Sequence, residues 1–325
     1  MPDRFSAKRE EERETIVNRT VGNFLTVRGG AEGTKIVVTG KGGVGKTVIS
    51  SALSTIFAEN GFGVLAVDGD PQMNMAPTLG LSASQIASIT PLNEQLDYIE
   101  ERVGARPNSG WGMFLTLNPN VKDVVSRFGV EVTDRIRLLV MGTLSKAAVG
   151  CLCPENTLLE ATVNHIALTR NEAVVMDTEA GVEHFGRAIA KGFNHAVVVT
   201  DPSHNACSVA AHALRLAHDL RIPGLHLVCN RWRSEDDRQK VVRFMADANL
   251  GFDFSFHMIP YEPQVYECDP SIQPVLKGGA GAFVRSLEEL FEELRPPLVE
   301  ALPLTAASSR GQAGVRLVSG PSIGE

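Results

Sequence analysis

Short apolar runs recur along the chain, and helical patterns lie between most of them. The runs are rich in β-branched residues and almost free of internal polar residues, as expected of buried strands. They span residues 36–39, 64–67, 136–140, 173–176, 196–200, 225–228 and 254–259. Helical patterns follow at 205–220 and 235–248, for example. This alternation predicts a single α/β domain with a mainly parallel sheet of seven or eight strands and helices on both faces.

The predicted domain spans residues 34–294. Residues 1–33 mix charged residues with glycines, and we expect an extension there that is mobile and partly helical. Residues 82–130 break the rhythm with prolines and glycines, which indicates an irregular insertion after the second strand. Residues 295–325 are rich in Pro, Ala, Ser and Gly, a composition typical of a disordered tail.

Residues 40–47 read GKGGVGKT, a full match to the phosphate-binding pattern G-x-x-x-x-G-K-[ST]. A predicted strand precedes this loop and a predicted helix follows it, so a glycine-rich turn without a ligand is the weaker alternative. Lys46 is expected to supply a charge to the phosphates and the Thr47 hydroxyl to bind Mg²⁺. Backbone N–H groups and the helix N terminus complete the anion site. The remaining loop residues predicted to bind nucleotide are Gly42, Gly43, Val44 and Gly45.

Lys41 makes this loop more informative than an ordinary P-loop. If Lys46 already lies at the γ-phosphate, Lys41 cannot easily reach the same group, which indicates a role across a subunit interface. A solvated loop lysine is the alternative. The sequence of residues 40–47 resembles the deviant P-loop of the family that includes septum-site and partition ATPases, the nitrogenase iron protein and metal-insertion ATPases. The resemblance implies that Lys41 crosses the interface of a homodimer with nucleotide sandwiched between its subunits.

Carboxylates follow two predicted strands. Asp68 and Asp70 come directly after the second strand in the turn DGDP, where one of them is placed to orient water or to reach Mg²⁺, although such a sequence is also ordinary turn chemistry. In the resembling family, the aspartate before this proline, here Asp70, belongs to a nucleotide-sensing switch implicated in hydrolysis. Asp177 ends the run 173–176 in the manner of a Walker B strand and is expected to bind Mg²⁺ through water.

Two further regions bear on nucleotide binding. Gly181 allows a second nucleotide-sensing segment to change conformation as the γ-phosphate appears or leaves. Glu183 and His184 either take part in that switch or are ordinary polar residues of a helix. Asn230 follows another strand, and its amide suits the adenine edge or the cap of the next turn. In the family an asparagine at this position reads adenine, and residues 259–262, with Pro260, resemble a second base-side loop. The resemblance therefore favours ATP and ADP over GTP.

Cys151 and Cys153 form a C-x-C pair just before a helix predicted to begin at Pro154. They are too close in sequence for an easy disulfide, and the helix N terminus favours thiolate. Two thiolates are half of a tetrahedral zinc or nickel site, and a symmetric second copy supplies the other half. The alternative is a pair of semi-buried cysteines. We assign the other cysteines to packing and do not predict the isolated histidines to be ligands; the cysteines are Cys207, Cys229 and Cys268.

Taken together, the P-loop, the DGDP turn, the C-x-C pair and the segment from Asp177 to His184 are similar to those of the CooC-type ATPases. Those proteins assist nickel insertion into carbon monoxide dehydrogenase. The match covers about residues 34–294, with Thr178 where asparagine is expected. It implies a Mg²⁺-dependent ATPase that forms a homodimer and binds Zn²⁺ or Ni²⁺ through the cysteine pairs. The implied client is apo carbon monoxide dehydrogenase.

Two other functions remain open from the sequence. An electron-transfer ATPase resembling the nitrogenase iron protein holds a [4Fe-4S] cluster between subunits, but its ligand cysteines are far apart in sequence. A partition or septum-site ATPase needs a basic surface or a basic membrane helix, whereas this chain has a net charge of −7 and an acidic last helix. We therefore expect no nucleic-acid binding and no stable membrane association. With no apolar run of about 20 residues and no signal-peptide pattern, a cytoplasmic location is expected.

Overall fold

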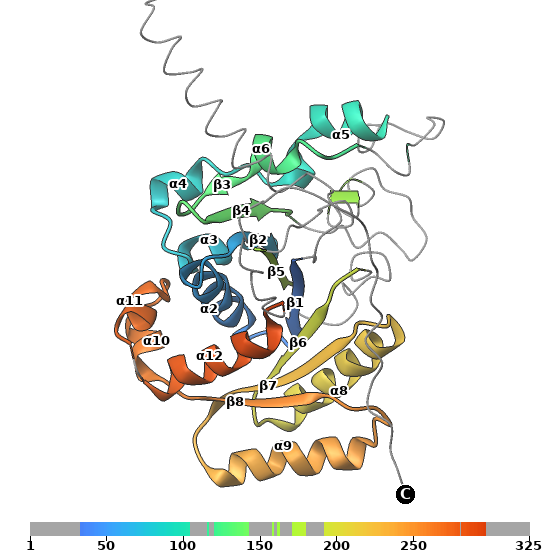
Figure 1. The fold of residues 1–325 in the computed structure, drawn as a ribbon, viewed down its shortest axis with the longest axis vertical. Coiled ribbons are helices and arrows are strands. Elements are labelled where there is room, and N and C mark those ends of the chain that lie inside the picture. The colour runs from blue at the N-terminus through green and yellow to red at the C-terminus, as the bar shows by residue number, and fades with distance from the viewer. Residues whose placement is uncertain are drawn as a thin grey trace, which may run out of the picture.

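The computed structural model describes residues 33–104, 116, 120–142, 158, 161–162, 171–179, 192–279 and 281–296. Within these residues the chain forms an eight-stranded sheet in the order β3-β4-β2-β5-β1-β6-β7-β8 (Figure 1). Neighbouring strands are parallel except for the pair β3 and β4. The strands are β1 (Thr34–Gly40), β2 (Gly63–Gly69), β3 (Val130–Glu131), β4 (Ile136–Val140), β5 (Glu172–Thr178), β6 (His195–Thr200), β7 (Gly224–Trp232) and β8 (Ser255–Pro260).

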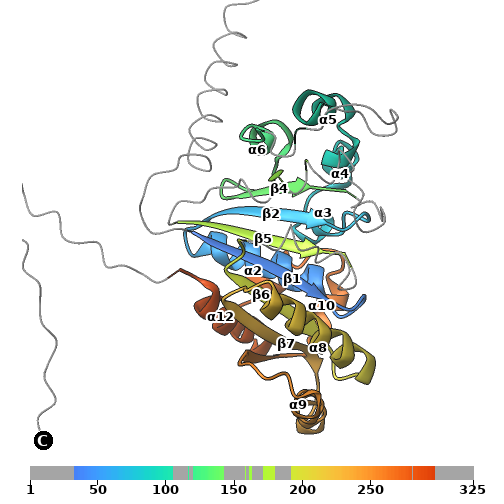
Figure 2. The same cartoon turned by 90° about the vertical axis from the view of Figure 1, so that its right-hand side faces the viewer.

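Helices cover both faces of this sheet (Figure 2). The described helices are α2 (Lys46–Glu59), α3 (Met75–Thr78), α4 (Ala83–Ala87), η1 (Leu92–Glu94), α5 (Leu96–Val103), α6 (Val124–Phe128), α8 (His204–Asp219), α9 (Glu235–Ala248), α10 (Pro263–Glu267), α11 (Gln273–Lys277) and α12 (Ala282–Leu294). Successive strand residues point to opposite faces, so β1 places Ile36 and Val38 in one core and Val37 in the other. Helices α2 and α12 pack in the first core, and α5, α6, α8 and α9 pack in the second.

Aromatic packing joins α2 to α12. The Phe57 ring lies 4.7 Å from the Phe291 ring and 5.3 Å from the Phe62 ring, in edge-on contacts. Each of these side chains is at most 8% exposed, and burying one contributes about 1.5–3 kcal/mol to the free energy of unfolding. The acidic last helix is therefore acidic only on its outer side, and its apolar side belongs to the core.

The predicted fold class is confirmed: six of the seven apolar runs lie within strands, and the seventh, 254–259, begins one residue before β8. The strand β3 was not predicted, because two residues at an antiparallel sheet edge carry no readable period. The described part of 82–130 contains the short elements α4, η1, α5 and α6. Most of 1–33 and 295–325 lies outside the described residues, so the proposed domain limits stay predictions. None of the helices in the described ranges has the length and apolarity that a membrane crossing requires.

Candidate nucleotide site

The P-loop begins where β1 ends, at the carboxyl edge of the sheet, where parallel α/β sheets bind ligands. Gly40 has a φ of 145°, and a side chain there would collide with the Val199 carbonyl oxygen of β6. Gly45 has a φ of 97° and precedes α2, and a side chain there would collide with the Asn230 amide. Both positions therefore require glycine for reasons of space as well as of backbone conformation.

Lys46 is the first residue of α2 and is only 7% exposed. Its Nζ donates to the carbonyl oxygen of Lys41 at 3.4 Å, which is a long contact for an ammonium group. Burial lowers the pKa of this amine, while the carboxylates of Asp177 and Asp70 act in the opposite direction. An anion in the loop would stabilise the charged ammonium and replace its weak backbone contact.

The two residues predicted to serve Mg²⁺ are in direct contact. The Thr47 Oγ1 hydroxyl donates to Asp177 Oδ2 at 2.6 Å, and Ser50 Oγ donates to Asp177 Oδ1 at 3.1 Å. Asp177 is 1% exposed, and burial raises the pKa of its carboxyl to about 6, although both hydroxyls and Lys46 favour the ionised form. A hydroxyl and a carboxylate side by side are oxygen donors of the kind that Mg²⁺ takes in nucleotide sites, so these residues fit the ion.

The two aspartates of the turn after β2 have different environments. Asp68 is fully buried beside Asp177, and its carboxylate accepts from the backbone N–H of Asp70 at 2.9 Å and of Met75 at 3.0 Å. Burial and then the charge of Asp177 raise the pKa of Asp68 to about 7. Asp70 is partly exposed at the tip, and its Oδ1 accepts from the Gln72 N–H at 2.9 Å. Asp68 thus shapes the turn and leaves Asp70 accessible for chemistry.

The buried Asp68 carboxyl predicts a specific pH dependence of stability. Its folded pKa lies above the unfolded value of 3.8, so the folded state binds the extra proton and this contribution to stability is lost as the pH rises through 7. Between pH 5 and pH 8, the wild type should lose about 3 kcal/mol of unfolding free energy relative to Asp68→Asn. Urea unfolding without nucleotide or Mg²⁺ at both pH values measures this difference. A gap between the two proteins that does not change with pH would contradict the assignment.

The end of β7 supports the P-loop from the other side. Asn230 Nδ2 donates to the Val44 carbonyl oxygen at 2.8 Å, and Arg231 Nη1 donates to the Gly43 carbonyl oxygen at the same distance. Arg231 itself has a φ of 62°, which turns its side chain back toward the loop. The sequence patterns did not indicate Arg231. The sequence feature that could have indicated it is a basic residue directly after the asparagine that follows the strand.

The predicted base-side residues Asn230 and Pro260 line one cavity beside the P-loop. Its other lining residues are Val48, Arg231, Tyr261, Glu262, Val265, Tyr266 and Phe283. The Arg231 guanidinium lies 5.5 Å from the centre of the Tyr266 ring. In this structure the Asn230 amide uses one donor and one acceptor position on the backbone, and a primary amide has one more of each. Adenine recognition by Asn230 stays a prediction.

Comparisons with known proteins place the chain in a nucleotide-binding family. Residues 35–275 match the family model described as the CobQ/CobB/MinD/ParA nucleotide binding domain. The chain belongs to this family. The carbon monoxide dehydrogenase accessory protein CooC of Rhodospirillum rubrum is 34% identical over 78% of this chain and 96% of its own length. An uncharacterized ATP-binding protein of Methanocaldococcus jannaschii is 36% identical over 79% of this chain and 96% of its own length.

Solved structures of the family share the fold. A ParA family ATPase of Chlorobium tepidum superposes with a TM-score of 0.55 and 18% identity, covering 81% of this chain and 98% of its own. The cell division protein MinD of Aquifex aeolicus gives 0.53 and 19%, covering 84% of this chain and 99% of its own. The chain is thus a P-loop ATPase related to CooC, and the family resemblance drawn from its motifs is confirmed.

Not every predicted site residue of this ATPase can be placed. Lys41 is described, lies partly exposed in the P-loop and contacts Lys46 through its backbone carbonyl. The cysteines predicted to bind Zn²⁺ or Ni²⁺ and the residues of the second switch lie outside the described residues: Cys151, Cys153, Gly181, Glu183 and His184. Two of the cysteines assigned to packing, Cys207 and Cys229, are buried in the core, and Cys268 is partly exposed.

Proposed function

We propose that this chain is a Mg²⁺-dependent ATPase that acts as a nickel-insertion factor for carbon monoxide dehydrogenase. In this proposal, two chains form an ATP-dependent homodimer, and Cys151 and Cys153 of both chains bind one Zn²⁺ or Ni²⁺ ion. The observation that carries the proposal is the presence of a C-x-C pair and Lys41 in a chain that is 34% identical over most of its length to a carbon monoxide dehydrogenase accessory protein. Two cysteines provide half of a four-thiolate site, and a two-fold axis provides the rest.

The described residues supply a consistent hydrolysis site. The P-loop N–H groups and Lys46 bind the phosphates, and Thr47 and Asp177 would hold Mg²⁺, which neutralises phosphate charge when it is bound. Asp70 orients the attacking water, and Lys41 of the partner chain stabilises the charge that develops on the γ-phosphate. Because the Asp68 carboxylate binds the backbone on both sides of the Asp70 turn, a displacement of Asp70 by nucleotide is transmitted to α3.

Nickel-dependent activation of apo carbon monoxide dehydrogenase tests this function. Wild-type protein with Mg-ATP should raise the rate at which a limiting amount of Ni²⁺ activates the client, and Lys46→Ala should remove that effect because the phosphates lose their buried counter-charge. A non-hydrolysable ATP analogue with the wild type separates binding from hydrolysis. Equal activation by the wild type and Lys46→Ala would refute a nucleotide-driven role in nickel insertion.

The positioning functions of related ATPases receive less support. A membrane-binding role requires a free amphipathic helix, but the apolar side of α12 packs against α2, with Leu287, Leu290 and Phe291 at most 3% exposed. The outer side of α12 carries four glutamates against one arginine, Arg285, and this negative balance would repel an anionic membrane or DNA. The cytoplasmic location expected from the sequence remains part of this proposal.

A further inference from the structure

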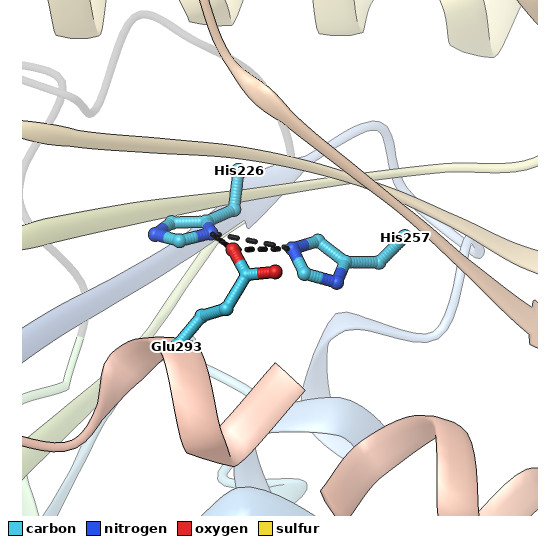
Figure 3. Close-up of side chains that lie close together, drawn as sticks. All are labelled: His226, His257 and Glu293. Atoms are coloured by element: carbon cyan, nitrogen blue, oxygen red, sulfur yellow. Dashed lines mark hydrogen bonds and ion pairs between the residues drawn. The ribbon is translucent and has the colours of Figure 1, made fainter. Parts of the chain in front are cut away.

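Three histidines lie side by side on neighbouring strands, far from the P-loop in the plane of the sheet. His195 begins β6, and His226 and His257 are each the third residue of β7 and β8, so the group lies toward the amino ends of these strands. The P-loop lies at the opposite, carboxyl ends. All three positions share the phase of strand residues that face the core of α2 and α12. Glu293, near the end of α12, points at His226 and His257 (Figure 3).

The separations among the donor atoms match those of a coordination polyhedron, although the two imidazole nitrogens are also within hydrogen-bonding distance of each other. His226 Nδ1 lies 3.3 Å from His257 Nε2, and Glu293 Oε2 lies 3.6 Å and 3.5 Å from these two nitrogens. Ligands at about 2.0–2.1 Å from a tetrahedral Zn²⁺ lie about 3.3–3.4 Å from each other. A carboxylate held by charge-assisted hydrogen bonds would instead approach to about 2.7–2.9 Å.

A second layer of contacts orients these ligands. His195 Nδ1 lies 3.0 Å from His226 Nε2, the nitrogen that faces away from Glu293. Metal-bound imidazoles commonly donate their other N–H to such an acceptor, which fixes the tautomer. Gly224 is opposite His195 in the strand register, and a side chain there would collide with the imidazole. The glycine therefore makes room for the ring that orients His226.

The two histidines are buried, while Glu293 is open to the solvent. The side chains of His226 and His257 are 5% and 9% exposed, whereas that of Glu293 is 48% exposed and leaves a route from the solvent. A histidine binds a metal through the lone pair of an unprotonated ring nitrogen, and neutral imidazole is the common metal-binding form.

We propose that His226, His257 and Glu293 bind a divalent transition-metal ion of the zinc class in tetrahedral geometry. The described residues offer three donors to this ion, which leaves the fourth position to water or an external ligand. The site links the last helix of the domain to two strands of the sheet. Its ligands are not the cysteines of the proposed shared site, and the proposal does not depend on the role in nickel insertion.

Metal titration of the full chain with Cys151→Ser and Cys153→Ser tests this site without the thiolate pair. We expect one Zn²⁺ ion to bind per chain, and Co²⁺, used as a spectroscopic probe, to show the intense visible bands of tetrahedral coordination. Adding Glu293→Gln should weaken Zn²⁺ binding by at least about 10- to 100-fold, the loss that replacing even an outer-shell partner of a ligand causes. Because Glu293 is half exposed, this substitution should leave the fold intact.

Glu288→Gln is the matched control, because Glu288 is an exposed residue of the same helix and the substitution removes the same charge. The Glu288→Gln protein should bind Zn²⁺ as tightly as the parent protein with Cys151→Ser and Cys153→Ser, and its Tm should rise as much when Zn²⁺ is added. The Tm of the Glu293→Gln protein should not rise. His257→Ala provides a second variant that removes a nitrogen ligand. Equal Zn²⁺ affinity in the Glu288 and Glu293 variants, or octahedral Co²⁺ spectra in both, would overturn the proposal.

Discussion

Replacing Lys41 with alanine should lower the rate of ATP hydrolysis by about 10³-fold, the lower end of the effect of a charge supplied in trans to a phosphoryl group. ATP affinity should change much less. Lys41 contacts Lys46 only through its backbone carbonyl among the hydrogen bonds of the described loop, and alanine retains that carbonyl. Lys46→Ala, by contrast, should lose both ATP binding and hydrolysis. Steady-state ATPase rates together with equilibrium ATP binding distinguish the two variants.

Mixing two inactive variants tests whether Lys41 acts across the interface. A dimer of one Lys41→Ala chain and one Asp70→Asn chain has one site with an intact Asp70 and an intact Lys41 from the partner. Random pairing makes half of all dimers mixed, so about a quarter of wild-type activity should return. If Lys41 serves its own nucleotide, neither site of the mixed dimer is complete. An inactive mixture whose subunits exchange would therefore exclude the trans role.

Replacing both Cys151 and Cys153 with alanine should abolish tight binding of Zn²⁺ or Ni²⁺ at the proposed shared site. The double substitution removes all four thiolates of the proposed dimer. These thiolates are the only ligands that the proposed shared site has. Metal content should fall from one ion per two chains to none, and binding should no longer depend on ATP. The measurement is best made in a Glu293→Gln background, which weakens binding at the proposed histidine site.

Cys268→Ala is the control for general thiol chemistry. Cys268 is the partly exposed one among the described free cysteines, so it is the residue at which adventitious metal binding is most easily expected. Its replacement should leave the metal content unchanged. If the double variant binds as much metal as the wild type, with or without ATP, the metallochaperone function is wrong, although the ATPase site is unaffected.

The contact between Thr47 and Asp177 could be predicted from local sequence patterns, although the two residues are far apart along the chain. Thr47 and Asp177 are 130 residues apart, yet their contact follows from two local patterns, because a P-loop and a strand-ending acid meet at the same edge of a parallel sheet. The sheet register fixes which strands are neighbours, and β1 pairs directly with β5. Local signals thus sufficed to predict that Thr47 and Asp177 lie close together, while their binding of Mg²⁺ stays a prediction.

Other contacts depend on geometry that no local pattern encodes. The side chain of Arg231 reaches the Gly43 carbonyl oxygen only because Arg231 adopts a positive φ beside the irregularity where β7 pairs with β8. The histidines looked isolated along the chain, although His195, His226 and His257 recur at intervals of 31 residues. Their convergence needed the order of three strands and the position of α12.

The oligomeric state of the purified chain tests the central claim most directly, because the trans lysine and the shared thiolates both require a second copy. Native mass spectrometry of the full chain should be recorded with Mg-ADP, with a non-hydrolysable Mg-ATP analogue, and with each nucleotide plus Zn²⁺ or Ni²⁺. The account predicts a dimer with the ATP analogue. In the Glu293→Gln background it predicts one tightly bound metal ion per dimer, and this ion should be absent when Cys151→Ala and Cys153→Ala are added. A monomer under every condition would contradict it.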